Sequence, residues 1–249
     1  MIPAKTDPHV SCPIVCGEYM RATGFFLTAT NQTYLVTARH NLLPTNAAAL
    51  ETGDYPLTYQ TNDFLPTIDI YLRDGPGFTV KRVDLLDKHG ILIDDRIDVL
   101  GIPIDIDPEE YGYLPWTLDD IEAPDATPPT LDVIGFSGRS FPDDDVYDID
   151  IYTQHVTGPY VLTVHDDENT TAHTPTETGF LAFALDNGPE KHESEYNGYS
   201  GSPILGTGLT GIHCANVPVT AVNTDTNNTT ETTAIAYWRA DALNQLLRM

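Results

Sequence analysis

Short runs of β-branched and aromatic residues alternate with clusters of Gly, Pro, Asn and Asp along most of this chain. Runs of this length between turn residues are typical of β-strands. Apolar residues recur at helical spacing only near the C-terminus, where we predict one α-helix over residues 240–249. The pattern therefore indicates an all-β protein of the sandwich or barrel type. The predicted strands are Gly24–Thr28, Tyr34–Thr37, Thr67–Leu72, Phe78–Leu85, Val99–Ile104, Leu131–Gly135, Tyr160–Val164, Gly179–Leu185, Ser202–Leu205, Leu209–His213 and Ala234–Trp238.

Length and local composition indicate how the chain is divided. A chain of 249 residues can bury one large core or two cores of about half that size. Residues 106–130 are rich in Pro, Asp and Glu and carry little strand pattern, which is typical of a linker. Residues 220–233 are rich in Asn and Thr and are predicted to form an exposed loop. We therefore expect two β domains, at residues 12–115 and 116–249.

The charge balance excludes two classes of partner. The chain carries 37 acidic and 12 basic residues, for a net charge of −25. A polyanion is repelled by nucleic acid and by anionic membrane surfaces, so we expect neither as a partner. Acidic residues are spread along the whole chain and lysines are few, a composition that resembles that of proteins from salt-loving organisms. This halophilic character predicts that the protein works in high salt.

Cysteine usage and the lack of targeting patterns bear on the cellular compartment. Cys12, Cys16 and Cys214 are too few, and odd in number, for a disulfide framework, which favours a reducing compartment. Cys12 and Cys16 have no second pair of zinc ligands, and the acidic runs lack the spacing of a calcium loop, so we expect no metal and no cofactor. We find no apolar run of membrane-spanning length and no signal-peptide pattern. The predicted location is the cytoplasm, with a high-salt cytosol.

The stretch Gly198-Tyr199-Ser200-Gly201-Ser202-Pro203 places a serine in a glycine-rich turn. Glycines let the backbone bend sharply and present its N–H groups to a substrate oxyanion. A serine hydroxyl is a weak nucleophile unless a base removes its proton. Ser200 is therefore a candidate nucleophile that needs a histidine and an acid from elsewhere in the chain.

Among eight histidines, His40 has the most informative context. A strand entered through Gly24 is followed by a second strand that ends in Thr37-Ala38-Arg39-His40. His40 is therefore a candidate general base for Ser200. A partly buried histidine that merely caps the strand is the structural alternative, and His213, only 13 residues after Ser200, is a rival base.

The candidate acid is Asp98, which lies 58 residues after His40 and directly precedes the apolar strand Val99–Ile104. Asp94 and Asp95 are close competitors, and a solvated aspartate with no role is common in so acidic a chain. An acid in this role holds the tautomer of the histidine and stabilises the imidazolium.

The three motifs in the order His, Asp, Ser resemble the trypsin-like (chymotrypsin-fold) serine peptidases. The resemblance spans roughly residues 20–249 and rests on the L-V-T-A-x-H, D-V-L and G-Y-S-G-S-P stretches. It implies two six-stranded antiparallel Greek-key β-barrels with a C-terminal helix, and an oxyanion hole formed by the N–H groups of Gly198 and Ser200. The α/β-hydrolase elbow is excluded because its histidine follows the serine and position 202 is Ser rather than Gly.

Two departures from the family pattern affect activation and specificity. Tyr199 stands where zymogen-activated members carry an aspartate, so the resemblance implies a domain built in its active form. Gly211-Ile212-His213 looks like the pocket strand of the glutamyl endopeptidases, in which a histidine receives a Glu or Gln side chain. His213, Cys214 and Glu195 are the predicted pocket residues, but Glu195 would repel an acidic side chain or pair with His213, which leaves a basic substrate side chain as an alternative. A strand histidine without substrate contact remains the alternative.

The sequence thus predicts a serine endopeptidase that cleaves peptide or protein substrates through His40, Asp98 and Ser200. The alternative is a catalytically inactive binding module on the same fold, since a fold does not fix a function. A structural β-protein of an acidic cell surface is a third interpretation, which the complete set of three residues disfavours. Neither the natural substrate nor the oligomeric state follows from the sequence.

Overall fold

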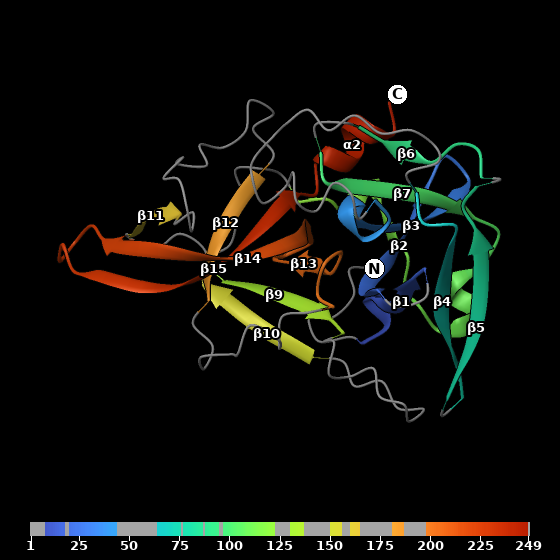
Figure 1. Ribbon diagram of the computed structural model, residues 1–249, viewed down its shortest axis with the longest axis horizontal. Helices are drawn as coiled ribbons and strands as arrows, with labels where there is room; N and C mark the ends of the chain where they lie inside the picture. The colour runs from blue at the N-terminus through green and yellow to red at the C-terminus, as the bar shows by residue number, and fades with distance from the viewer. Residues whose placement is uncertain are drawn as a thin grey trace.

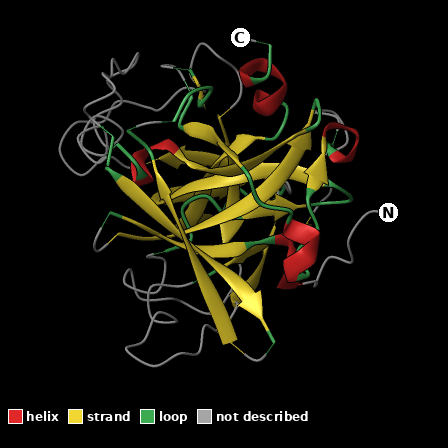
Figure 2. Ribbon diagram, turned by 90° about the vertical axis from the view of Figure 1, so that its right-hand side faces the viewer, coloured by secondary structure: helices red, strands yellow, loops and turns green. Residues whose placement is uncertain are grey.

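The computed structural model describes residues 8–17, 20–43, 64–75, 77–86, 88–94, 97–122, 130–136, 150–155, 160–164, 181–186 and 198–248. These residues form two β-sheets and one C-terminal α-helix, which confirms the predicted all-β, chymotrypsin-like class (Figures 1 and 2). No helix within the described residues is long and apolar enough to cross a membrane.

The first sheet has eight strands in the order β5-β4-β1-β2-β3-β7-β6, with β8 paired to β2. All pairs are antiparallel except β2 with β8. Among the described strands, β5 and β6 at the two ends of this order do not pair with each other. The strands are β1 (Cys12–Cys16), β2 (Met20–Ala29), β3 (Gln32–Ala38), β4 (Thr67–Asp74), β5 (Gly77–Asp84), β6 (Leu92–Ile93), β7 (Val99–Ile104) and β8 (Trp116–Thr117).

The second sheet has seven strands in the order β11-β14-β13-β9-β10-β12-β15. Because β14 also pairs with β15, six of these strands pair in a ring, and β11 is attached to β14 outside it. The long β14–β15 hairpin extends well beyond the rest of the sheet (Figure 1). The strands are β9 (Thr130–Gly135), β10 (Asp150–His155), β11 (Tyr160–Val164), β12 (Leu181–Asp186), β13 (Pro203–Leu205), β14 (Leu209–Asn223) and β15 (Thr229–Arg239).

Every strand expected from the sequence is present, but two expectations about other segments need correction. Residues 220–233 are not one loop, because β14 runs to Asn223 and β15 starts at Thr229, which leaves only a short turn between them. Threonine is favoured in strands, and Thr229, Thr230, Thr232 and Thr233 suit an exposed two-stranded ribbon, so polar composition alone did not mark a loop. The C-terminal helix α2 spans Ala242–Leu246, which is shorter than the predicted 240–249.

The segment expected to link two domains has structure of its own. Within residues 106–122 lie two short 3-10 helices, η5 (Pro108–Tyr111) and η6 (Leu118–Asp120), with β8 between them. Asp107 caps η5 by accepting from the N–H of Glu109. Two further 3-10 helices are η1 (Pro8–Val10) and η2 (Arg39–Asn41). The domain boundary between residues 115 and 116 stays a prediction.

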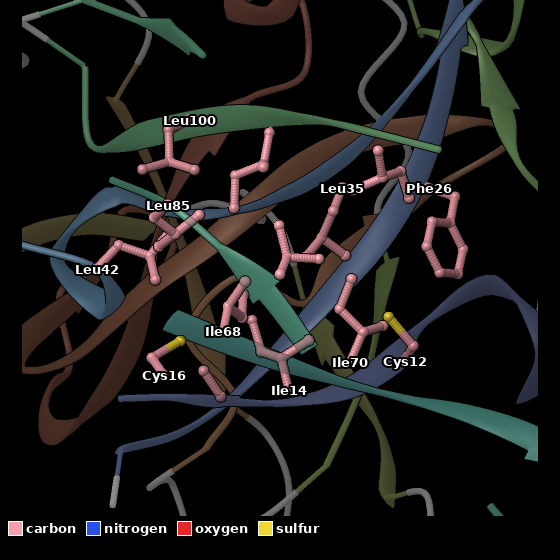
Figure 3. Close-up of a cluster of buried hydrophobic side chains, with 14 of the residues drawn as sticks. Cys12, Ile14, Cys16, Phe26, Leu35, Leu42, Ile68, Ile70, Leu85 and Leu100 are labelled. Atoms are coloured by element: carbon pink, nitrogen blue, oxygen red, sulfur yellow. The ribbon is translucent and has the colours of Figure 1, made fainter. Parts of the chain in front are cut away.

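Each sheet buries its own apolar face, and a third cluster joins the two sheets. The first core gathers side chains such as Ile14, Phe26, Leu35 and Ile70, with Cys12 and Cys16 among them as free thiols (Figure 3). The joining cluster brings side chains of both sheets and of α2 together. Its members include Phe25, Val36, Ile97, Val99, Trp116, Ile134, Leu205, Ile212, Trp238, Leu243 and Leu246. This shared core fixes the relative position of the segments that carry the candidate site.

Candidate active site

His40 and Asp98 are brought together by the pairing of β3 with β7. The antiparallel register sets Ala38 opposite Val99, so the residues just beyond these strand ends meet. The N–H of Arg39 continues the ladder by donating to the carbonyl of Asp98 at 3.2 Å. His40 then lies in η2, immediately after β3. A separation of 58 residues in sequence becomes direct contact because two strands pair.

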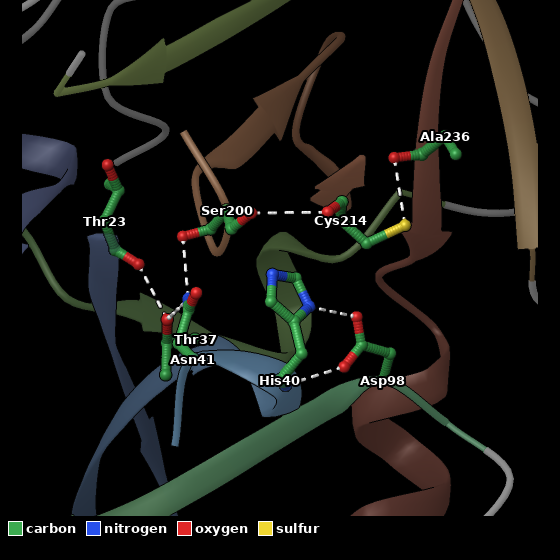
Figure 4. A network of polar contacts seen from close by, with 8 residues as sticks. All are labelled: Thr23, Thr37, His40, Asn41, Asp98, Ser200, Cys214 and Ala236. Carbon is green, nitrogen blue, oxygen red and sulfur yellow. Dashed lines mark hydrogen bonds and ion pairs between the residues drawn. The ribbon is translucent and has the colours of Figure 1, made fainter. Parts of the chain in front are cut away.

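Asp98 contacts His40 through both carboxylate oxygens. Its Oδ2 lies 2.7 Å from Nδ1 of the imidazole, and its Oδ1 accepts from the backbone N–H of His40 at 2.9 Å (Figure 4). The carboxylate is 1% exposed and the imidazole 17% exposed. Burial alone would lower the pKa of His40, but the charge of Asp98 and the hydrogen bond to it outweigh burial and raise it.

Ser200 lies in a tight turn that depends on two glycines. Gly198 and Gly201 have φ angles of 98° and 91°, which L side chains rarely adopt. The N–H of Ser202 closes the turn by donating to the carbonyl of Tyr199 at 2.8 Å. A Cβ at Gly201 would lie 2.2 Å from the carbonyl oxygen of Thr23, so only glycine lets this turn approach β2 so closely.

The serine turn is hydrogen-bonded to the first sheet at several points. The carbonyl of Ser200 accepts from the N–H of Thr23 at 3.1 Å and from Nδ2 of Asn41 at 3.0 Å. The hydroxyl of Thr23 donates to the carbonyl of Gly198 at 2.8 Å. Asn41 follows His40 directly in the chain, so the same short segment carries the imidazole and holds the serine turn. Figure 4 shows Ser200 beside the imidazole of His40, with Asn41 bonded to the serine carbonyl.

The hydroxyl of Ser200 donates to the carbonyl of Cys214 at 3.3 Å. Within the described part of the chain it makes no hydrogen bond to His40. Cys214 is an extra residue on β14, because the pairing with β15 shifts between His213 and Ala215. In the same described part, the N–H groups of Gly198 and Ser200 donate to no acceptor.

Two buried residues, Arg39 and Asp94, support this arrangement in roles that the sequence did not indicate. Arg39 is fully buried, and its Nη1 donates to the carbonyl of Asp94 at 2.6 Å. The carboxylate of Asp94 accepts from Nε2 of Gln245 in α2 at 2.8 Å. Asp94, a rival acid in the sequence, thus links the loop before Asp98 to the C-terminal helix. The signal for this role was a charged residue, Arg39, between an apolar strand and His40.

His213 lies on β14 with its imidazole 1% exposed. Burial, together with the nearby charge of His40, lowers the pKa of His213 to about 4, although Asn216 and the backbone of Tyr199 oppose the shift. Its ring meets that of Tyr199 edge to face, with the ring centroids 6.2 Å apart. Neither ring nitrogen makes a hydrogen bond of normal geometry to a described residue. His213 is therefore a neutral, buried hydrogen-bonding group beside the serine turn.

Cys214 and Glu195 are the other two predicted pocket residues. Cys214 is half-buried, and its thiol donates to the carbonyl of Ala236 at 3.1 Å. Burial raises the pKa of this thiol well above its ordinary value, so it is not a reactive thiolate. Glu195 lies outside the described residues, as does Asp95, the remaining competitor for the acid.

Solved structures with similar folds include serine proteases. The HtrA-type protease AlgW superposes with a TM-score of 0.53 over 99% of this chain, at 10% identity, and this chain covers 63% of its length. A thermostable serine protease, AL20, from an extremophilic microorganism gives 0.52 over 98% of this chain and 96% of its own, at 10% identity. A Glu endopeptidase gives 0.52 over 100% of this chain and 94% of its own, at 14% identity.

Likeness at this level of identity shows the fold and not the activity. An inactivated protease paralogue of the scabies mite also superposes, with a TM-score of 0.50 and 14% identity, over 100% of this chain and 97% of its own. No family model matches the sequence, and no curated protein is similar to it. The chemistry of the site must therefore be argued from its own residues.

Proposed function

We propose that this protein is a serine endopeptidase in which His40, Asp98 and Ser200 act together. The observation that carries the proposal is the contact of Asp98 with His40 through both oxygens, one at 2.7 Å from Nδ1. With Nδ1 bonded to Asp98, the other ring nitrogen, Nε2, stays available as a base. In Figure 4 that nitrogen lies on the edge of the ring that faces Ser200.

The reaction follows from these groups. The hydroxyl of Ser200 turns from the carbonyl of Cys214 toward His40, which is a rotation about one side-chain bond. Nε2 takes the hydroxyl proton while Oγ attacks the peptide carbonyl carbon, and the oxyanion is bound by the N–H groups of Gly198 and Ser200. His40 then returns the proton to the leaving amine as the C–N bond breaks. Water repeats the sequence on the acyl-enzyme and releases Ser200.

No proteolytic activation is needed in this proposal. Tyr199 is fully buried in the core of the second sheet, where it packs with Val133 and Ile204. A buried tyrosine has no negative charge with which to bind a newly cut N-terminus. The turn that carries Ser200 is held instead by Thr23 and Asn41.

For substrate preference we propose a Gln or Glu side chain beside the cleaved bond, bound by His213. A neutral imidazole donates one N–H, which can bond an amide or a carboxylate oxygen but adds no positive charge. With a pKa of about 4, His213 stays neutral at physiological pH, so Gln is favoured over Glu. Because the ring is 1% exposed, the pocket must open toward it when substrate binds.

A catalytically inactive binding module is the second candidate. It is favoured by the hydroxyl of Ser200, which bonds to Cys214 rather than to His40.

A fluorophosphonate probe separates the two candidates. We expect the wild-type protein, assayed in high salt, to be labelled and the variant Ser200→Ala to lose the label. Ser202→Ala is the matched control, because the hydroxyl of Ser202 is fully buried and has no hydrogen-bond partner in the described part of the chain. A wild-type protein that resists the probe while properly folded would favour the binding module. Peptide-library profiling then tests for cleavage after Gln in preference to Glu, Lys or Leu.

A further inference from the structure

The first sheet ends in a strand with a free edge. Among the described strands, β5 pairs only with β4. A cavity of about 440 Å³ lies beside this edge, between β5 and the residues at which β7 ends. Its lining is Lys81, Arg82, Val83, Asp84, Lys88, Ile104, Asp105 and Ile106. This volume is within the range of ordinary ligand sites.

The charges around this cavity differ from those of the chain as a whole. Lys81 and Lys88 form no ion pair or hydrogen bond through their side chains to a described residue, although the chain carries 37 acidic residues. Arg82 is occupied by Asp69, with both hydrogen bonds at 2.7 Å. Asp84 accepts from the N–H of Leu86 at 3.0 Å through one of its two carboxylate oxygens. Among the described residues, the site therefore offers two lysines without an ion pair, beside the carboxylates of Asp84 and Asp105.

Apolar side chains surround the same site. Val83 and Ile104 are buried beneath the cavity, and Ile106 is half-buried. Val80 and Leu86 flank it in sequence and are each 50% exposed, which is unusual for large apolar residues among those described. Val80 and Leu86 are not part of the cavity lining, but they offer a bound segment apolar contacts next to Lys81 and Lys88.

We propose that edge strand β5 and this cavity dock an extended acidic peptide segment of a partner protein. The carboxylates of the segment pair with Lys81 and Lys88, and its apolar side chains cover Val80 and Leu86. Its main chain can add to the free edge of β5, as in other cases of strand addition. A chain of net charge −25 repels acidic partners almost everywhere else, so the lysines also set where such a partner can approach.

A free inorganic anion does not account for this site. Phosphate could pair with the lysines, but it would leave Val80 and Leu86 exposed and would use no edge of β5. Lysines on edge strands also discourage aggregation. That role requires neither the cavity nor Lys88, which lies beyond β5.

The test uses a fluorescent peptide of three Leu-Glu repeats and the Ser200→Ala variant of the full chain. This variant lacks the proposed nucleophile, so the peptide stays intact whether or not the protein is a peptidase. We expect saturable binding that weakens as salt is raised above about 0.15 M, where exposed charges are screened beyond about 8 Å. Replacing both lysines in the background variant (Lys81→Gln with Lys88→Gln) should weaken binding roughly tenfold.

The matched control is Arg248→Glu, which changes the net charge by the same amount at an exposed residue outside the cavity. It should leave the binding constant unchanged to within about twofold. The docking proposal is overturned if Leu-Gln repeats bind as tightly, if inorganic phosphate displaces the peptide completely, or if the double variant binds like the control. Dimerisation of the chain through β5, seen as a mass change lost in the double variant, would also overturn it. None of these outcomes changes the result of the fluorophosphonate assay.

Discussion

Asp98 makes two hydrogen bonds to His40, one from its Oδ2 to the imidazole Nδ1 and one from its Oδ1 to the backbone N–H of the same residue. The side chain and the main chain of His40 are thus fixed by a single buried carboxylate. Two bonds from one acid to one residue set the rotation of the ring as well as its tautomer. This geometry leads to the first of four expectations.

Asp98→Asn should remove the charge that keeps the pKa of His40 high. With burial still acting on the ring, the pKa of His40 should fall below its ordinary value. NMR titration of the imidazole measures this directly. Asp225→Asn, in the exposed turn of the β14–β15 hairpin, is the control and should leave the titration unchanged. If the proposed function holds, kcat should also drop by roughly four orders of magnitude in Asp98→Asn.

Gly201→Ala should disrupt the serine turn. The new Cβ would lie 2.2 Å from the carbonyl of Thr23, at a φ of 91° that alanine rarely adopts. Backbone and neighbours must both shift, so we expect a loss of roughly 3 kcal/mol or more in the free energy of unfolding. Gly75→Ala separates backbone strain from steric clash, because the φ of Gly75 is also positive, at 60°, but nothing lies within 4 Å of the new Cβ. That variant should lose only about 1 to 2 kcal/mol. Urea denaturation of both variants measures the difference, and equal losses would contradict the close-packing argument.

Arg39→Met should loosen the loop that carries Asp98. Arg39 is fully buried and holds the carbonyl of Asp94, whose carboxylate is held in turn by Gln245. Losing a buried charged donor should cost about 1 to 3 kcal/mol of stability. The proton shared by His40 and Asp98 should lose its downfield NMR signal or exchange faster, and kcat should fall more than KM rises.

The matched change is Arg82→Met, which removes an arginine whose side chain is 69% exposed and paired with Asp69. Because the side chain of Asp69 is only 11% exposed and loses both bonds from Arg82, this change should also cost about 1 to 3 kcal/mol, but it should leave the proton signal of His40 in place. Equal effects of the two variants on this signal would show that Arg39 does not position the pair.

His213 should make the protein less stable in acid. Its pKa is about 4 when folded and returns to its ordinary value of 6.5 when unfolded, so between these limits the unfolded chain binds more protons. The contribution of neutral His213 to the free energy of unfolding is fully present above pH 6.5. It is lost as the pH falls from 6.5 to 4, by up to about 3 kcal/mol at pH 4. His213→Gln cannot titrate and should show a correspondingly weaker dependence. Parallel curves of unfolding free energy against pH for the two proteins would refute this.

Much of the fold could be predicted because the spacing of apolar residues and the residue types that favour turns are local properties of the sequence. The ranges Val99–Ile104 and Tyr160–Val164 match β7 and β11 residue for residue. Strand β1 (Cys12–Cys16) was missed because it is short and contains a proline, which usually marks an end or an edge. The ribbon around residue 226 was mistaken for a loop because exposed strands and loops share polar composition.

The sequence by itself determined the strand pattern, the glycine-rich turn at Ser200 and the order His40, Asp98, Ser200. It favoured Asp98 over Asp94 and Asp95 because Asp98 directly precedes the apolar strand Val99–Ile104, but it could not show that this carboxylate contacts His40. The register of β3 with β7 brought Asp98 into contact with His40. The packing of α2 against the rest of the fold brought Gln245 within hydrogen-bond distance of Asp94. The hydrogen bonds from Thr23 and Asn41 to the serine turn likewise form only when the two sheets pack together. Contacts between distant segments arise only when burial forces their backbones to meet, so tertiary structure alone decided them.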